Sequence, residues 1–223
     1  MRAEPRNVLI LGMNWSGKSY AAGYSAATIS RDFVIIVSQS RDPAYLHHLQ
    51  VSRIRFVRAT SAGYSITPEL LEETRQDASL QHKRYLYITV GDLTPNQVKD
   101  FETQLVQAVK ASKNLALIID EAHLFCDRIH ACDELRGFAR GARHYGVDLI
   151  FVTHRLFDID VSIRCVLTHL VLFRTVEGRD LDVLARHLDL GARAAAVAQL
   201  PRYYYLFINR AYPDAGQVTA SRL

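Results

Sequence analysis

Residues 7–19 read NVLILGMNWSGKS, in which an apolar run of strand length ends at Gly12 and a loop then leads to Gly17, Lys18 and Ser19. The loop has the pattern G-x-x-x-x-G-K-S and lies between a predicted strand and a predicted helix. Glycines allow the backbone N–H groups to point inward at phosphate oxygens, and the start of the helix adds partial positive charge. In such loops the lysine reaches the β- and γ-phosphates and the hydroxyl ligates Mg²⁺. The residues expected to bind nucleotide are Gly12, Met13, Asn14, Trp15, Ser16, Gly17, Lys18, Ser19 and Tyr20.

A second pattern, LALIIDEAH at residues 115–123, is typical of the other half of a nucleotide site. Asp120 ends an apolar run and is expected to hold the Mg²⁺ water shell opposite Ser19. Glu121 is expected to polarise an attacking water as a general base, which favours hydrolysis over phosphate transfer to a metabolite. Paired acids also occur as helix caps, but the phosphate loop upstream favours the functional interpretation. The guanine-reading pattern N-K-x-D does not occur in the chain, so ATP and Mg²⁺ are the expected cofactors.

Apolar runs of strand length alternate with helical patterns along most of the chain. Strands are expected at 7–12, 33–38, 54–59, 85–91, 115–120, 148–154, 169–175 and 203–209. Helices are expected from 17 onward and at 68–79, 95–113, 133–145, 179–188 and 193–200. The alternation predicts one α/β domain over residues 1–223, with a mainly parallel sheet between two helical layers. Its core is expected at about 7–210, with a polar tail after 211. The run at 54–59 alternates apolar and charged residues, which predicts a sheet edge.

Composition places the chain among ordinary globular proteins. It has 223 residues, of which 49% are apolar and 22% charged, and this excludes disorder, collagen and coiled-coil structure. The net charge of +4 is too small to indicate a nucleic-acid partner by itself, although 22 of the 27 basic residues are arginine. There is no signal-peptide pattern and no apolar run near the ~18 residues that span a bilayer. The three cysteines, Cys126, Cys132 and Cys165, lack metal-ligand spacing, so we expect a soluble intracellular protein with reduced thiols.

The segment DELRGFARGARHYG at 133–146 places Arg136, Arg140 and Arg143 on one face of a predicted helix. A solvated basic face is the simpler interpretation. The alternative is an arginine finger, which would stabilise negative charge on the γ-phosphate bound to a neighbouring subunit.

The overlapping segment GARHYGVDLIFVTHR at 141–155 resembles the stretch R-x-x-G-x-x-(apolar strand)-T-Q-R of the FtsK/HerA superfamily of DNA-pumping ATPases. The resemblance covers roughly residues 7–175 and implies a three-layer RecA/FtsK-like P-loop NTPase fold. It further implies that Arg143 is a finger acting in trans and that His154 senses the γ-phosphate. The family usually has Gln at the sensor position, so this histidine is a departure from its pattern. Arg140 is the other candidate for the finger.

Chains of this length that lack a large extra domain resemble, within that superfamily, the genome-packaging ATPases of tailless icosahedral viruses with an internal membrane. The resemblance implies a homo-oligomeric ring, with a hexamer as one candidate size, that moves double-stranded DNA. It also implies a host-cytoplasmic or virion-associated location, with capsid or viral membrane proteins as candidate anchors. The alternatives are a P-loop kinase of a small metabolite, a nucleotide-switched adaptor without turnover, and a Zot-like phage assembly ATPase.

Strand periodicity also predicts which way two groups of side chains face. Arg53 and Arg55 are expected to point to one side of the strand at 54–59, where they either contact a DNA backbone or protect the sheet edge. Tyr203 and Tyr205 are expected to share a face of the last strand, in which packing is favoured over base stacking.

Overall fold

The computed structural model describes residues 4–49, 53–77, 83–126, 133–210 and 219–222 of the chain. Its strands are β1 (Asn7–Leu11), β2 (Phe33–Ser38), β3 (Ile54–Ala59), β4 (Arg84–Val90), β5 (Ala116–Ile119), β6 (Asp148–Thr153), β7 (His169–Phe173), β8 (Tyr204–Asn209) and β9 (Thr219–Arg222). Within these ranges the strands form one sheet in the order β3-β4-β2-β5-β6-β1-β7-β8-β9. All pairs from β3 to β7 are parallel, whereas β8 and β9 are added antiparallel.

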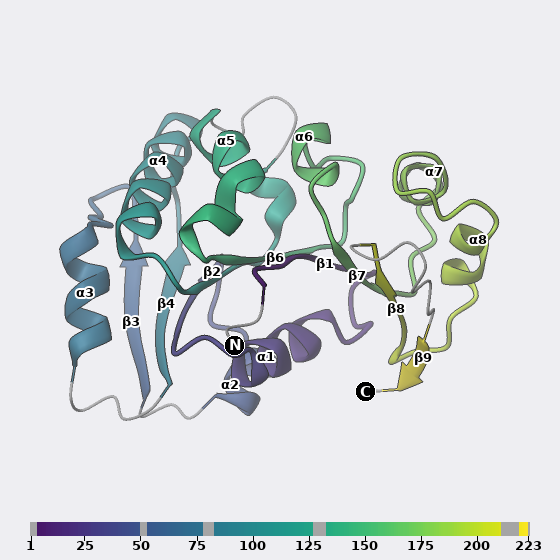
Figure 1. Cartoon of the computed structure of the whole chain (residues 1–223), viewed down its shortest axis with the longest axis horizontal. Helices are drawn as coiled ribbons and strands as arrows, with labels where there is room; N and C mark the ends of the chain where they lie inside the picture. Colours follow the sequence, from purple (N-terminus) through teal and green to yellow (C-terminus); the bar gives the residue numbers. More distant parts are fainter. Residues whose placement is uncertain (1–3, 50–52, 78–82, 127–132, 211–218, 223) are drawn as a thin grey trace.

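Helices cover both faces of this sheet. They are α1 (Lys18–Thr28), α2 (Pro43–His48), α3 (Pro68–Gln76), α4 (Pro95–Ser112), α5 (Asp133–Gly141), α6 (Val161–Arg164), α7 (Gly178–Arg186) and α8 (Arg193–Ala198), with short 3-10 turns η2 (Ala122–Leu124) and η3 (Ala142–Tyr145). Helices α1 and α2 pack on one face and α3 to α8 on the other, so that two apolar cores enclose the strands (Figure 1). This arrangement confirms the predicted three-layer α/β fold with a mainly parallel sheet.

The burial of the strands follows their sequence. Every residue of β2 and β6 is buried, as their continuous apolar runs predict. Strand β3 lies at the sheet edge and keeps half-exposed side chains, which confirms the interpretation of its alternating sequence. Arg55 of β3 contacts Glu73 of α3 at 3.4 Å, and this contact favours edge protection over a DNA contact for Arg55. Because the central strands are parallel, their carboxyl ends meet at one edge, where ligand sites of such sheets form.

Capping residues explain where several helices begin. The Thr67 side chain accepts a hydrogen bond from the Leu70 N–H at the start of α3, and Thr94 forms a capping box with Gln97 at the start of α4. Helix α2 is not among the expected helices, although Asp42 caps it and is followed by proline, as Thr67 is at the start of α3.

The C-terminal region differs from the prediction. Residues 219–222 form β9 where the sequence predicts a polar tail, and residues 211–218 lie outside the described residues. The sequence TASR has no apolar alternation, so its strand character arises from antiparallel pairing with β8. Tyr203 precedes β8 with a left-handed φ of 67°, so the prediction that Tyr203 and Tyr205 share a strand face is wrong.

Two further predictions concern cysteines and membrane spans. Cys165 is an exposed free thiol and Cys126 is buried, whereas Cys132 lies outside the described residues. None of the helices in the described ranges combines the length and the apolar character that are required to cross a bilayer.

Candidate active site

The predicted phosphate loop connects β1 to α1 at the carboxyl edge of the sheet. The Gly12 N–H donates to the Thr153 carbonyl at 3.3 Å, and the Met13 N–H donates to the Arg174 carbonyl at 2.9 Å. The loop is therefore held by the ends of both strands that flank β1. Gly17 closes it with φ 106°, a left-handed conformation that favours glycine, directly before Lys18 begins α1.

The interior of the loop is polar and tightly enclosed at Gly12. A Cβ atom at this position would lie 2.6 Å from both the Phe173 Cβ and the Ser16 Oγ. The Ser16 hydroxyl is itself buried and has no hydrogen-bond partner among the described residues. Buried polar groups are normally hydrogen-bonded, so an unpartnered hydroxyl inside such a loop fits a site that is completed by a phosphate oxygen.

The contact at Gly12 gives a testable prediction. Gly12→Ala is expected to lower the free energy of unfolding by about 1–3 kcal/mol, because the added methyl group overpacks against Phe173, and to weaken ATP binding. Thermal unfolding and calorimetric titration with a non-hydrolysable ATP analogue measure the two effects. Gly137→Ala is the matched control, since nothing lies within 4 Å of its added Cβ in α5. Unchanged stability and affinity in the Gly12 variant would contradict the assignment of a close-packed loop.

Lys18 lies at the base of the loop and is buried. Its Nζ donates to the Met13 carbonyl at a long 3.4 Å. Burial lowers the pKa of Lys18, although the negative charges of Glu121, Asp120 and Asp42 oppose the shift. A buried ammonium with one weak hydrogen bond in the described structure fits a phosphate-binding role, because a bound polyphosphate would supply both charge and acceptors.

Asp120 follows β5 and is also buried. Its Oδ2 accepts a hydrogen bond from the Ser38 hydroxyl at 3.1 Å, and its Oδ1 accepts from the Glu121 N–H at 3.0 Å. Burial, and next the charge of Glu121, raise the pKa of Asp120 to about 6. The Ser19 hydroxyl and the Asp120 carboxylate are the oxygen ligands that Mg²⁺ prefers, so these residues fit the predicted metal site.

Glu121 turns back from β5 in a left-handed conformation with φ 49°. Its Oε2 lies 2.9 Å from the Nδ1 of His154 and 3.5 Å from the Nδ1 of His123. The two imidazole rings are 4.6 Å apart at an interplanar angle of 74°. The structure therefore brings the predicted base and the predicted sensor histidine into direct contact.

Two hollows flank the phosphate loop, and Asn14 lines both. One, of about 430 Å³, is lined by Lys18, Ser19 and Glu121 together with Trp15, Tyr20 and Tyr203. The other, of about 590 Å³, is lined by Met13, His154 and residues near the start of α7. Lys18 and Glu121 thus face the same space, which is what phosphate binding and water activation require of them.

Asp180 on α7 borders the second hollow and carries a pH-dependent contribution to stability. Burial raises the pKa of Asp180 to about 6, above the value of about 3.9 in an unfolded chain. A raised folded-state pKa favours the protonated form, so the stabilising contribution is full in acid and is lost as the pH rises through 6. Relative to Asp180→Asn, wild type is expected to lose about 2–3 kcal/mol of unfolding free energy between pH 4 and pH 8. Denaturant titrations at several pH values test this, with exposed Asp182→Asn as the control, and parallel curves for wild type and Asp180→Asn would refute it.

The arginines at 136, 140 and 143 do not lie on one unbroken α-helix, as the helix expected at 133–145 would require. Helix α5 ends at Gly141 and continues as the tighter η3, which ends at Gly146 in a left-handed conformation. Arg136 is half-buried and pairs with Asp160 at 3.2 Å, whereas Arg140 and Arg143 are exposed. The glycines end the α-helix early, because glycine is a weak helix former and adopts the left-handed C-cap conformation readily.

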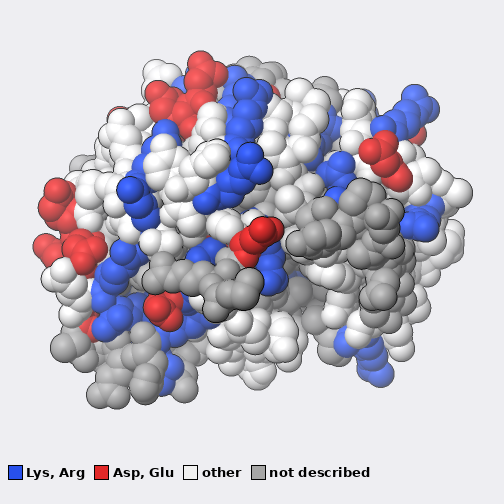
Figure 2. All heavy atoms as spheres, viewed as in Figure 1, with Lys and Arg blue, Asp and Glu red and all other residues white. Residues whose placement is uncertain are grey.

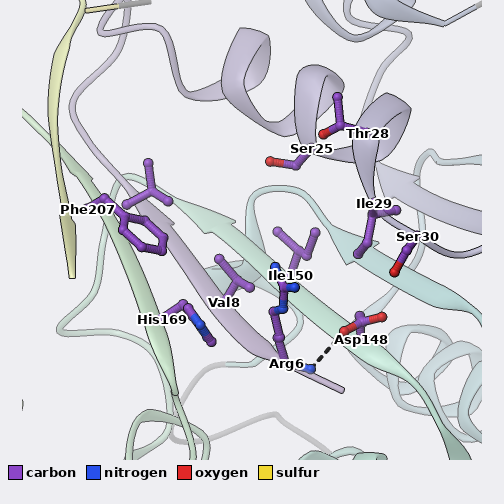
Figure 3. A pocket seen from close by; sticks show the side chains of 11 residues that line it. Arg6, Val8, Ser25, Thr28, Ile29, Ser30, Asp148, Ile150, His169 and Phe207 are labelled. Atoms are coloured by element: carbon purple, nitrogen blue, oxygen red, sulfur yellow. Dashed lines mark hydrogen bonds between the residues drawn. The ribbon is translucent and has the colours of Figure 1, made fainter. Parts of the chain in front are cut away.

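Arg143 lies just before β6, at the edge of the sheet opposite to the phosphate loop. It lines a hollow with Arg6 and His169, which also line a neighbouring hollow of about 260 Å³ under the end of α1. Figure 3 shows this neighbouring hollow, in which the Arg6 N–H donates to Asp148 at 2.8 Å. The structure therefore does not bring Arg143 to the phosphate loop of its own chain, and its role as a finger in trans stays a prediction.

Sequence reasoning missed several residues around the loop. His123 belongs to the D-E-A-H string, from which the sequence predicts a role only for Asp120 and Glu121, and Ser38 ends a strand that the topology places beside β5. Arg202 donates from Nε to the Trp15 carbonyl at 3.2 Å, and its guanidinium lies 4.7 Å from the Tyr203 ring centroid. A polar residue at the end of an apolar run was the available signal for Ser38, whereas no local signal links Arg202 to the loop.

Charge is not concentrated on the face that Figure 2 shows. Lys and Arg side chains are interspersed there with Asp and Glu, without one continuous basic patch. This agrees with the interpretation that a net charge of +4 does not by itself indicate a nucleic-acid partner.

Comparison with known proteins gives matches in structure alone. No family model matches the sequence, and no curated protein matches it. The crystal structure of B204, the DNA-packaging ATPase from Sulfolobus Turreted Icosahedral Virus, is similar with a TM-score of 0.67 and 21% identity, over 99% of this chain and 98% of that one. The genome packaging NTPase B204 from Sulfolobus turreted icosahedral virus 2, in complex with ATP-gammaS, has a TM-score of 0.66 and 16% identity, over 98% and 97% of the two chains. VirB4 of Thermoanaerobacter pseudethanolicus has a TM-score of 0.62 and 14% identity, over 92% and 87%. These similarities confirm the predicted P-loop NTPase fold.

Proposed function

We propose that this protein hydrolyses ATP and couples hydrolysis to the movement of double-stranded DNA, as a genome-packaging motor of a virus. The observation that carries the proposal is the arrangement of Lys18, Asp120 and Glu121 beside one pre-folded loop at the carboxyl edge of β1 and β5. A buried cation, a buried carboxylate and a half-exposed carboxylate supply phosphate binding, metal binding and water activation in one place.

Each residue has a separate task in this proposal. Lys18 and the loop N–H groups bind the β- and γ-phosphates, and Ser19 and Asp120 would hold Mg²⁺. When bound, Mg²⁺ supplies positive charge against the phosphate oxygens. Glu121 orients the attacking water and accepts its proton, while His154, through its contact with the Glu121 carboxylate, positions that base and senses the γ-phosphate.

The motor would be a ring of identical subunits, with six as one candidate number. Arg143 is exposed at the sheet edge opposite to its own loop, so it can meet a γ-phosphate only on another copy of the chain. A head-to-tail interface between identical subunits places opposite faces in contact, and it forms a ring when the rotation from one subunit to the next closes. In this arrangement Arg143 completes the site of a neighbouring subunit, and a capsid or viral membrane protein would anchor the ring.

Two similar structures support the coupling to DNA packaging. Their proteins are described as a DNA-packaging ATPase and a genome packaging NTPase, and the match covers nearly the whole of both chains in each case. The similarity to these two structures therefore extends well beyond the phosphate loop.

An ATPase assay with and without long duplex DNA tests the proposal. Wild type is expected to hydrolyse ATP, and the rate of hydrolysis is expected to rise several-fold when duplex DNA is present. The reason is that a translocating motor couples hydrolysis to its contact with DNA. Glu134→Gln, which replaces an exposed residue of α5, is expected to behave like wild type in both conditions. Turnover that needs a small acceptor and ignores DNA would instead identify a metabolite kinase, and nucleotide binding without turnover would identify a nucleotide-switched adaptor.

A further inference from the structure

The side chains of Glu121, His123 and His154 form a cluster of three metal-ligating groups. One ligand atom from each lies within 4.8 Å of those of the other two. We propose that this cluster is a binding site for a divalent transition metal ion of the zinc class, separate from the Mg²⁺ expected at Ser19 and Asp120. The inference of binding rests on the ligand geometry, and only its consequence for hydrolysis rests on the proposed function.

The distances suit a shared ion. Both histidines place Nδ1 near the same carboxylate oxygen, Glu121 Oε2, at 2.9 Å for His154 and 3.5 Å for His123. Ligands bound tetrahedrally at about 2.0–2.1 Å from one zinc ion are about 3.3 Å apart. The two observed separations bracket that value, so small side-chain rotations would bring the three atoms onto one ion.

The fold holds these ligands in place from two neighbouring strands. Glu121 and His123 lie on the turn that follows β5, and His154 follows β6, which pairs with β5 in parallel. The Thr153 hydroxyl, which accepts a hydrogen bond from the Arg155 N–H, lies 3.3 Å from the His123 Nδ1, and a bound ion would replace it as the partner of this nitrogen. The Glu121 and His154 side chains are 29% and 27% exposed, so an ion can enter from solvent without the chain opening.

The ligand types select the class of metal. Imidazole nitrogen suits zinc, copper, iron and nickel, whereas Mg²⁺ and Ca²⁺ prefer oxygen ligands. Two histidines and one carboxylate, with an open fourth position, form the ligand set of several protein zinc sites. The two sites therefore prefer different ions. The oxygen ligands of Ser19 and Asp120 favour Mg²⁺, whereas the cluster with two imidazoles favours a transition metal ion.

Metal binding here would stop the proposed hydrolysis. A Glu121 carboxylate bound to a transition metal ion can no longer accept a proton from water. Lys18 and the phosphate loop contribute no ligand to the cluster, so nucleotide binding would persist. The site would thus act as a reversible inhibitory switch on the base.

Titration of the full-length chain with Co²⁺ and then Zn²⁺, without nucleotide, tests the site. Wild type is expected to bind one equivalent of Co²⁺ with the visible absorption of a four-coordinate ion, and Zn²⁺ is expected to abolish this absorption. His123→Ala and His154→Ala are each expected to weaken Co²⁺ binding by at least about tenfold. Loss of a group that only hydrogen-bonds to a metal ligand already weakens metal binding by about tenfold or more, and these variants remove a ligand itself. His144→Ala is the matched control, because His144 is exposed and lies outside the cluster. His47→Ala/His48→Ala removes the paired histidines at the end of α2, which lie outside the cluster. Circular dichroism reports whether each variant is folded.

The outcomes are distinct. Absence of Co²⁺ binding to wild type would overturn the proposal, as would full binding in folded His123→Ala and His154→Ala, or loss of binding in the His47/His48 variant alone. Reversible inhibition of turnover by Zn²⁺ in excess Mg²⁺, with retained nucleotide binding, is expected if the proposed function also holds. If the chain shows no turnover but binds Co²⁺ through the cluster, the proposed function fails and the metal site stands.

Discussion

Replacing Glu121 with glutamine is expected to lower the rate of ATP hydrolysis by about 10²–10⁴-fold, the range of a general base. The amide keeps the size of the side chain and an oxygen that accepts a hydrogen bond from His154, but it cannot take a proton from water. Affinity for an ATP analogue is expected to stay within a few-fold of wild type, because the phosphates are held by Lys18 and the loop. Steady-state turnover and calorimetric titration measure the two quantities separately.

Glu134→Gln removes the same charge from the exposed start of α5 and controls for net charge. Turnover of Glu121→Gln at the rate of this control would remove Glu121 from the chemical step. A joint loss of hydrolysis and of nucleotide affinity would assign Glu121 a binding role in place of a catalytic one.

The second large effect concerns the division of one site between two subunits. Lys18→Ala and Arg143→Ala are each expected to reduce hydrolysis by about 10³-fold or more, the first through phosphate binding and the second through charge stabilisation. An equal mixture of the two variants is expected to recover activity at roughly a quarter of its sites, because a random ring pairs an intact Lys18 with an intact Arg143 that often. Hydrolysis measured across mixing ratios would show a maximum at intermediate composition.

The same mixing experiment with Arg140→Ala and Lys18→Ala decides whether Arg140 or Arg143 is the finger. The finger is the arginine whose alanine variant is inactive alone and recovers activity when mixed with Lys18→Ala. Arg193→Ala, another exposed arginine, is expected to retain activity without mixing. Mixtures of Arg143→Ala and Lys18→Ala that stay inactive at every ratio, while wild type is active, would contradict a finger in trans.

Most of the fold was readable from local sequence. Strands such as β2 and β6 are continuous apolar runs. Thr67 and Thr94 mark the starts of α3 and α4, because their side chains accept a hydrogen bond from a backbone N–H in the first turn. Strand β9 could not be predicted, because the polar sequence TASR becomes a strand only through its pairing with β8. Helix α2 could have been predicted from Asp42 and the proline that follows it.

The candidate site was readable in part. The phosphate loop and the acidic pair are contiguous patterns whose chemistry follows from residue type and spacing. The spacings of four and three residues between Arg136, Arg140 and Arg143 suggested a common face, but helix α5 ends at Gly141 and continues as a tighter turn that ends at Gly146. Periodicity assumes one unbroken helix, and it fails where glycine changes the backbone geometry.

The sequence by itself determined that a strand, a glycine loop and a helix create a phosphate site, with Lys18 inside it and an acidic pair to serve it. These features depend on residues close to one another in the chain. Only the tertiary structure decided that the Ser38 hydroxyl binds Asp120, that Glu121 meets His123 and His154, and that Arg143 lies at the far edge. The physical reason is strand order: parallel pairing of β5 with β2 and β6 brings carboxyl ends together that are distant in sequence. That order is set by packing of the whole sheet, which no single segment encodes.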